Sequence, residues 1–362
     1  MEHKGKLFFQ VACLLVGTLF VLLMGASASF SQGVTIKIGD IDKALELTVD
    51  KTNGEYNSSN VKSQAFKRFL ELSSNGKIKV EVYPNCQLGS DKEQLEMTQM
   101  GSLHMNVNPL NTIANIVPEF NALSIPYLFR DMNVAMKLVD GPIGKELADM
   151  ALKKIGVRIL KWNLEGGYDY MTTKKPFRLP GDLKGVKIRV PQNPAIIEIT
   201  KLVGASPTPI PWSEVYTSLQ QGVVDGVFTG FIFVNGAGLT DLLKNLTVAS
   251  PFFMFSAMQI NEKFYQSLKP EDQYLVKEAA MRANDAYVGL SYWGRDLWLD
   301  VFKQKGWNVY VPNAEEMAQW KKAIREPMIE WTKKIAGAAW VDKVVKAAEA
   351  AEKELYGDIK LK

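Results

Sequence analysis

The chain has 362 residues, a length that corresponds to about two domains of ordinary size. Apolar residues make up 47% of it and charged residues 23%, which excludes an intrinsically disordered chain and a multi-span membrane protein. The formal net charge is only +4 and no long run of lysine and arginine occurs, so we expect no nucleic-acid partner.

The first 28 residues are predicted to be a secretory signal peptide. Two lysines, Lys4 and Lys6, precede an apolar run over residues 7–26, and Ala26-Ser27-Ala28 supplies the small residues that signal peptidase requires. The run approaches the length that spans a bilayer, so an uncleaved membrane anchor is the alternative. Cleavage would leave an exported chain without this apolar segment.

The next part of the chain alternates strands with helices. Strands are expected where apolar residues alternate with polar ones, and helices where apolar residues recur at steps of three or four. Ser90 and Glu93 have the capping-box spacing that begins a helix. The expected elements are strands at 34–38, 78–82 and 103–107, with helices over 61–75 and 90–100.

The second half repeats this alternation and then becomes helical. Apolar residues recur at steps of three or four from Pro270 to Lys305, which predicts one helix on the order of 50 Å long. Such a helix is longer than a small domain and is expected to bridge two. The other expected elements are strands at 157–161 and 186–190, helices over 195–203 and 213–219, and a helical tail from Ala314.

This order of elements predicts an α/β fold with two units around open sheets, joined by ordinary strands so that they can close about a ligand. Phosphate-binding loops of the GxGxxG and GxxxxGK[ST] types are absent, as are the GxSxG and HExxH motifs of two hydrolase classes. We therefore expect no cofactor and no enzyme activity.

Few residues remain for metal or nucleophile chemistry. Removal of the signal leaves one cysteine, Cys86, and one histidine, His104. An intrachain disulfide and a His/Cys metal cluster are then impossible, and a catalytic pair with histidine would need His104. On the expected strand at 103–107 a single histidine is usually a surface or hydrogen-bonded residue, so we expect neither a metal nor a catalytic site.

Four motifs follow one another in a characteristic order. They are SNGKIKVEVYPN at 74–85 with QLGSDKE at 87–93, IPYLFRD at 125–131 with DGPIG at 140–144, DLKGVKIRVP at 182–191, and GASPTPIPWSEVY at 204–216 with LQQGVVDG at 219–226. In order and spacing they resemble the DctP-type substrate-binding proteins of tripartite ATP-independent periplasmic (TRAP) transporters, and the resemblance covers most of residues 34–310.

The resemblance implies a periplasmic solute-binding protein that performs no chemistry on its ligand. Such a protein captures a small organic acid between two lobes, which hinge strands and a long helix connect, and delivers it to the integral membrane subunits of the transporter. The alternative is a periplasmic sensor that presents the same ligand clamp to a signalling receptor.

The implied lobes are discontinuous in sequence. Lobe I would comprise residues 34–166 and 255–290, and lobe II residues 167–254 and 291–335. Residues 336–362 would form a C-terminal helical extension. This extension either contacts the transporter, forms a homodimer interface or simply packs on the lobes.

Arg189 is the expected ligand clamp. The resemblance implies that an arginine in the Lys-x-Arg-Val segment binds a ligand carboxylate, and that arginine is Arg189 here. A planar guanidinium offers two parallel N–H donors that match the carboxylate oxygens, and it stays charged in a desolvated cleft. From residue type alone, a surface arginine at a strand end would be the better interpretation.

The chain departs from the family pattern at two positions. Where many relatives have a base after a Gly-aromatic pair, this chain has Asp169, which would favour an amine or hydroxyl on the ligand or else pair with Lys174 or Lys175. Where the family has a polar triplet that contacts ligand, this chain has Val227-Phe228-Thr229, which leaves Thr229 to hydrogen-bond.

Aromatic residues gather near these positions and form either a pocket wall or part of the core. Core packing is the expectation for Phe231 and Phe233, whereas Trp212 is expected to face the pocket. The full set of candidate ligand-binding residues is Arg189, Asp169, Trp212, Thr229, Asn108 and Phe228.

Overall fold

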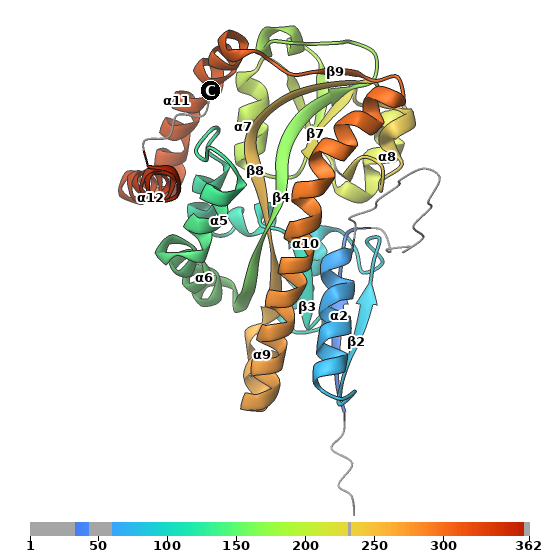
Figure 1. The fold of residues 1–362 in the computed structure, drawn as a ribbon, viewed down its shortest axis with the longest axis vertical. Helices are drawn as coiled ribbons and strands as arrows, with labels where there is room; N and C mark the ends of the chain where they lie inside the picture. The colour runs from blue at the N-terminus through green and yellow to red at the C-terminus, as the bar shows by residue number, and fades with distance from the viewer. Residues whose placement is uncertain (1–32, 43–59, 231–232, 358–362) are drawn as a thin grey trace, which may run out of the picture. The chain divides into compact units, whose positions relative to one another are not determined.

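A sheet of nine strands organises the protein, of which a computed structural model describes residues 33–42, 60–230 and 233–357 (Figure 1). The strands follow the order β2-β1-β3-β8-β4-β7-β5-β6 along the sheet, and β9 pairs with β8. They are β1 (Val34–Gly39), β2 (Ile78–Tyr83), β3 (Met105–Pro109), β4 (Val157–Thr172), β5 (Lys187–Val190), β6 (Ser206–Pro209), β7 (Gly226–Gly230), β8 (Asn245–Asn261) and β9 (Asn308–Tyr310).

Helices connect these strands, as the alternation in the sequence predicts. The capping box at Ser90 forms, since the backbone amide of Glu93 donates to the Ser90 hydroxyl and the Glu93 carboxylate accepts from the Ser90 amide. The α-helices are α2 (Val61–Ser73), α3 (Asp91–Met100), α4 (Asn111–Ala114), α5 (Met132–Asp140), α6 (Pro142–Ile155), α7 (Pro194–Leu202), α8 (Val215–Gln220), α9 (Glu262–Ser267), α10 (Pro270–Gln304), α11 (Ala314–Ala336) and α12 (Ala338–Tyr356).

The helix expected at 213–219 differs at its start. A turn of 3-10 helix, η3 (Trp212–Glu214), precedes α8, and Glu214 occupies the N-cap position without a side-chain hydrogen bond. Pro211 sets the extended backbone from which this turn begins. Trp212 rather than Ser213 is therefore the first residue of the helical segment.

Strand β4 is much longer than the strand expected at 157–161, and β8 has no counterpart among the expected strands. They pair antiparallel with each other from end to end and lie side by side in Figure 1. Three register shifts interrupt their pairing, one of them between Leu164 and Gly167. Each shift turns the following side chains toward the other face, so the alternation visible in the sequence stops after a few residues.

The strand pairing brings the carboxyl ends of two groups of parallel strands together. β1 and β3 run parallel, and β3 ends at Pro109 beside Ser256 of β8, which pairs with Asn163 of β4. β5 and β7 run in the opposite direction, and β7 ends at Gly230 beside Tyr168 of β4. Both groups therefore end near the same short stretch of β4. In open α/β sheets, this edge is where ligands bind.

Apolar side chains form separate clusters around this stretch. Helices α5, α6 and α12 pack with the first half of β4 in one cluster, and helices α7 and α11 pack with β5 and β7 in another. The predicted long helix is confirmed as α10, which has 35 residues, packs against α2 and β4, and ends in a third cluster through Trp298 and Phe302. The residue bounds of the two lobes stay a prediction.

The C-terminal helices use their apolar faces within the chain. Trp320, Ile324 and Met328 of α11 belong to the cluster around β5 and β7, whereas Val341 and Val344 of α12 belong to the cluster around α5 and α6. A homodimer through these helices stays a prediction and would have to use their outer faces.

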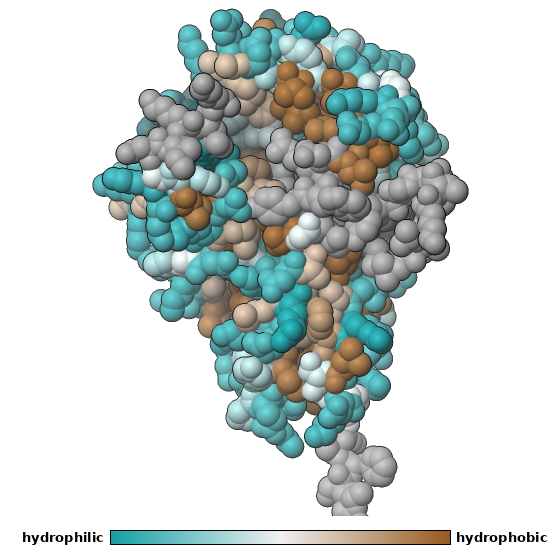
Figure 2. Space-filling view, viewed as in Figure 1, coloured by the Kyte–Doolittle hydropathy of each residue, from teal (hydrophilic) through white to brown (hydrophobic). Residues whose placement is uncertain are grey.

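The surface follows the amphipathic pattern of the helices. On the face drawn in Figure 2, hydrophilic residues predominate and apolar residues lie in separated groups. Among the described helices, none has both the length and the apolar content needed to cross a bilayer. The predicted signal peptide lies outside the described residues.

Candidate functional site

Two cavities meet where the two groups of parallel strands end. They share Ile41, Asp42, Trp212 and Phe233 in their walls. The larger has a volume of about 400 Å³ and extends toward Tyr216 and the residues after β7. The smaller has a volume of about 30 Å³ and is lined in addition by Asp91, Pro109, Asn111, Glu165, Tyr168, Arg189, Pro191 and Thr229.

Arg189 lies in the wall of the smaller cavity, and its side chain is held in place by the protein. The residue is 3% exposed, its Nε donates to the carbonyl oxygen of Ile210 at 2.9 Å, and its guanidinium lies 5.5 Å from the centre of the Trp212 ring. Burial lowers the pKa of Arg189 to about 10, so it remains protonated at neutral pH. Among the described residues, no carboxylate forms an ion pair with it.

Trp212 and Thr229 reach the same cavity from neighbouring elements. Trp212 comes from η3 and Thr229 from β7, and both contribute to the cavity wall with Tyr168 of β4. The β-ladder places Thr229 beside Asp169, directly next to Tyr168. Three of the six predicted residues, Arg189, Trp212 and Thr229, are thus brought together, with Phe233 as a further aromatic wall.

Asp169 is fully buried but lines neither cavity. Its carboxylate accepts a hydrogen bond of 2.6 Å from the Ser250 amide and further bonds from the Ser250 hydroxyl. Ser250 has a backbone φ of 38°, a strained conformation for a residue with a side chain, at a point where the pairing of β4 with β8 changes register. Lys175 donates instead to the Asp182 carbonyl.

We expect Asp169→Asn to lower the free energy of unfolding by about 1–3 kcal/mol, because it removes the charge that accepts from Ser250. Denaturant unfolding without ligand measures this, with the exposed Asp285→Asn as the control. Unchanged stability would contradict a structural role. A role in ligand selectivity stays a prediction, and a loss of affinity only for acids that carry an amine or hydroxyl would support it.

Phe228 and Asn108 lie next to the cavity wall without lining either cavity. The Phe228 ring stacks on Tyr170 with 4.0 Å between ring centres and contacts Tyr168 edge-on. Asn108 donates to the carbonyl oxygen of Asp91 at 3.3 Å. Both therefore support residues that do line the small cavity, and direct ligand contact by them stays a prediction.

The sequence patterns did not predict the acidic residues that line the cavity. Asp42 follows β1, Asp91 begins α3 and Glu165 lies on β4, yet all three line the smaller cavity. Burial, together with neighbouring Asp40, raises the pKa of Asp42 to about 8, and burial also raises the pKa of Asp91. Asp42 and Asp91 each lie close to the end of an expected strand or the start of an expected helix, which could have marked them as candidates.

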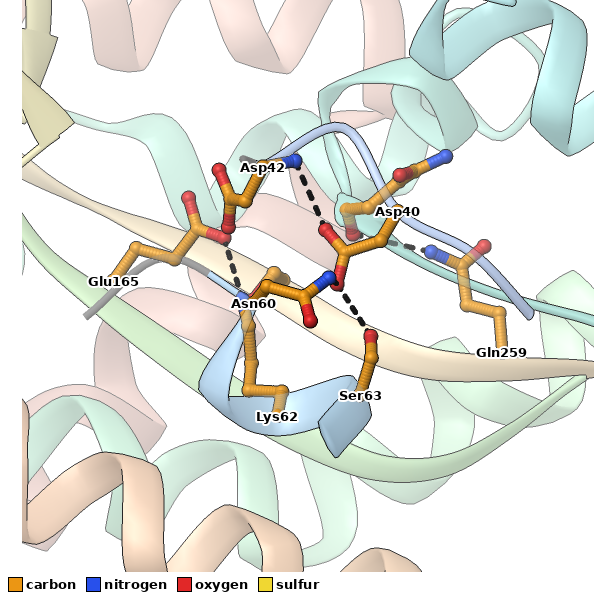
Figure 3. A network of polar contacts seen from close by, with 9 residues as sticks. Asp40, Asp42, Asn60, Lys62, Ser63, Glu165 and Gln259 are labelled. Carbon is orange, nitrogen blue, oxygen red and sulfur yellow. Dashed lines mark hydrogen bonds and ion pairs between the residues drawn. The ribbon is translucent and has the colours of Figure 1, made fainter. Parts of the chain in front are cut away.

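A buried network holds this acidic wall in place (Figure 3). Lys62 donates to Glu165 at 3.0 Å and to the hydroxyl of Ser256 at 3.1 Å. Burial alone would lower the pKa of Lys62, but Glu165 and the other nearby acids raise it overall. Asp40 accepts from the Asn60 side chain and from the Asp42 amide, so it anchors the loop that carries Asp42.

An open α/β sheet whose strand ends surround a cavity with a buried cation defines a small-molecule binding protein. The chain belongs to the bacterial extracellular solute-binding proteins, family 7, whose sequence profile matches residues 53–334. This confirms the predicted resemblance to the DctP-type substrate-binding proteins of TRAP transporters. Members of this family are transport proteins and not enzymes.

Curated relatives and solved structures agree with this assignment. The chain is 36% identical over 228 residues to the ectoine-binding periplasmic protein TeaA of Halomonas elongata, covering 62% of this chain and 65% of TeaA. It is 28% identical to the sialic acid-binding periplasmic protein SiaP of Vibrio cholerae, covering 82% and 89%. The sugar acid binding protein DctPAm of Advenella mimigardefordensis, solved with galactonate, has the same fold, with a TM-score of 0.81, 24% identity and coverage of 88% and 99%.

Proposed function

We propose that this protein is a periplasmic receptor that captures a small organic acid through Arg189 and delivers it to the membrane subunits of a TRAP transporter. The observation that carries the proposal is the buried guanidinium of Arg189, which is held in the cavity wall by Ile210 and Trp212 and has no carboxylate partner among the described residues. A buried guanidinium without a directly paired carboxylate is costly, and a ligand carboxylate would supply that pair.

The ligands of relatives support an acid. SiaP is named for sialic acid, and a TRAP solute-binding protein from Sulfurospirillum deleyianum, 26% identical with a TM-score of 0.77 and coverage of 86% and 98%, was solved with bound succinate. The relatives are transport proteins, so the sensor alternative is not favoured. Closure of the proposed lobes about β4 and β8 would bury the ligand and present one closed surface to the membrane subunits.

A thermal-shift screen of the purified protein against organic acids tests this function. A ligand at about 100 times its Kd should stabilise the folded protein by about 2.7 kcal/mol. Matched primary alcohols and amides of the same acids serve as controls, because they lack the carboxylate. If no acid in a broad set stabilises the protein, or if the uncharged analogues stabilise it equally, the proposed function is wrong.

We also expect residues 1–28 to be absent from the protein in the periplasm. The charged start, apolar run and small residues near Ala28 direct export and cleavage. Intact mass spectrometry of the periplasmic fraction measures the mature N-terminus, and the precursor accumulated in cells with blocked secretion is the control. A mass that retains Met1 would instead indicate an anchored form.

A further inference from the structure

The small cavity holds an excess of acidic groups around its single arginine. Asp42, Asp91 and Glu165 line it together with Arg189. Lys62 lies behind the wall and pairs with Glu165, which leaves Asp42 and Asp91 against Arg189. When a ligand carboxylate neutralises Arg189, the acidic groups have no remaining cation in the described wall to balance them.

Asp42 is the acid that the protein compensates least. Figure 3 shows its carboxyl group next to that of Glu165, and the ammonium group of Lys62 forms its ion pair with Glu165. The titratable groups near Asp42 are Asp40 on its own loop, Lys62 on α2, Glu165 and Tyr168 on β4, and Cys86 after β2, and of these only Lys62 is a cation. Among the described residues Asp42 forms no ion pair, and the cation near it, Lys62, is already paired with Glu165.

A second observation places a hydrogen-bond acceptor in the same cavity. Asn111 of α4 is 7% exposed, and its Oδ1 atom accepts no hydrogen bond within the described structure. A buried acceptor without a donor costs about 1–3 kcal/mol, and a donor on a ligand would remove that cost. The cavity thus presents one positively charged donor and several acceptors.

We propose that the ligand is zwitterionic, with its carboxylate at Arg189 and a cationic nitrogen group, an ammonium or an amidinium, at Asp42 and Glu165. This inference rests on the proposed function, because it takes the carboxylate at Arg189 as given. The N–H groups of such a cation also provide donors for the Asn111 side chain. The larger cavity beyond Asp42 leaves room for the rest of the ligand.

Charge separates this ligand class from other acids. A dicarboxylate would bring a second anion to Asp42 and Glu165, and like charges at close range are unfavourable. A hydroxy acid would satisfy hydrogen bonds but would leave the acidic wall without a counter-charge. A cationic nitrogen both neutralises Asp42 and donates to it, which makes the strongest kind of hydrogen bond in proteins.

The first experiment compares matched acids by calorimetry. The probes are ω-amino acids of graded chain length, the ω-hydroxy acids and the dicarboxylates of the same lengths, and α-amino acids with their α-hydroxy analogues. We expect the best amino acid to bind at least about tenfold more tightly than its hydroxy partner and more tightly still than the dicarboxylate. Equal or tighter binding of the hydroxy acid or dicarboxylate overturns the inference.

The second experiment uses Asp42→Asn, which keeps the size of the side chain and removes its charge. The variant should lose most of the preference for the amino acid over its hydroxy partner. Asp285→Asn, on the exposed face of α10, should leave both affinities unchanged. Circular dichroism checks that Asp42→Asn is folded, and a folded variant that keeps the full preference contradicts the role of Asp42.

The pH dependence of wild-type binding provides a measurement that needs no variant. Because the pKa of Asp42 is about 8, the free protein carries a proton there at lower pH, and a bound cation favours its loss. Affinity for the amino acid should rise up to tenfold per pH unit from about pH 6 to about pH 8 and then level off, while the amine stays protonated. A flat profile for the amino acid would contradict the inference.

These outcomes distinguish the two proposals. If acids bind and depend on Arg189, but the amino acids show no advantage, the receptor function stands and the zwitterion is wrong. If no acid binds, both fail.

Discussion

Arg189→Ala is expected to weaken the binding of the acid ligand by ~30-fold to several thousandfold. The ligand carboxylate would be desolvated in the closed site without its partner, and truncation of one member of such a pair costs about 2–5 kcal/mol. Each 1.4 kcal/mol changes the affinity by about tenfold. Calorimetry with an acid from the thermal-shift screen measures the effect.

Arg189→Lys separates charge from geometry. Lysine keeps the positive charge but has no second nitrogen with which to bind both carboxylate oxygens, and it cannot reproduce the Nε hydrogen bond to Ile210 together with a ligand contact. Its affinity should lie between those of the wild type and Arg189→Ala. Lys187→Ala is the matched control, because Lys187 is an exposed cation on the same strand.

A folded Arg189→Ala protein that binds the acid as tightly as the wild type would place the carboxylate clamp elsewhere in the chain. Circular dichroism and a thermal melt without ligand establish that each variant is folded. An affinity that decreases from wild type to Arg189→Lys to Arg189→Ala supports recognition of both carboxylate oxygens. Equal loss of affinity in the two variants would indicate that the positive charge contributes nothing without the planar guanidinium.

Lys62→Met is expected to lower the free energy of unfolding by about 3–5 kcal/mol. Lys62 and Glu165 are 1% and 5% exposed and lie 3.0 Å apart, so removal of the lysine leaves a buried carboxylate without its counter-ion. The substitution also removes the donor to the Ser256 hydroxyl. Chemical denaturation of the protein without ligand measures the change.

The double variant Lys62→Met/Glu165→Gln tests the cause of this loss. It removes both charges, so it should recover a substantial part of the stability that Lys62→Met loses. Lys92→Met is the control for an exposed pair, because Lys92 and Glu96 are 64% and 51% exposed, and we expect it to cost less than about 0.5 kcal/mol. A loss below about 1 kcal/mol in Lys62→Met would show that the buried pair contributes little to folding.

Several features of the fold, and two residues of the site, could be predicted from the sequence. The capping box at Ser90, the end of α2 before Gly76 and the long helix α10 all depend on residues close together in the chain, and each forms as expected. Arg189 and Trp212 could be identified because each lies in a contiguous motif. Local patterns of this kind predict the folded structure well, because they do not depend on strand register.

The acidic wall could not be predicted in the same way. Lys62 pairs with Glu165 across 103 residues and bonds to Ser256 across 194, and nothing near any of the three in the sequence indicates the other two. The Gly166-Gly167 interruption and the register shifts of β4 decide which side chains face the cavity. Asp169 bonds to Ser250 at the register shift between Tyr168 and Tyr170. Phe228 stacks on Tyr170, because neighbouring residues of a strand alternate between faces and Phe228 therefore points away from the side of Thr229.

The sequence by itself determined the class of fold and many of its helices and strands, and a family motif marked Arg189 as the cation expected to meet the ligand. These depend on periodicity and on contiguous motifs, both of which are properties of short segments. Only the tertiary structure decided which acids surround that cation, because two groups of parallel strands meet end to end at one stretch of β4. Charge balance in a cavity depends on groups that the fold brings together from distant segments, and no short segment contains that information.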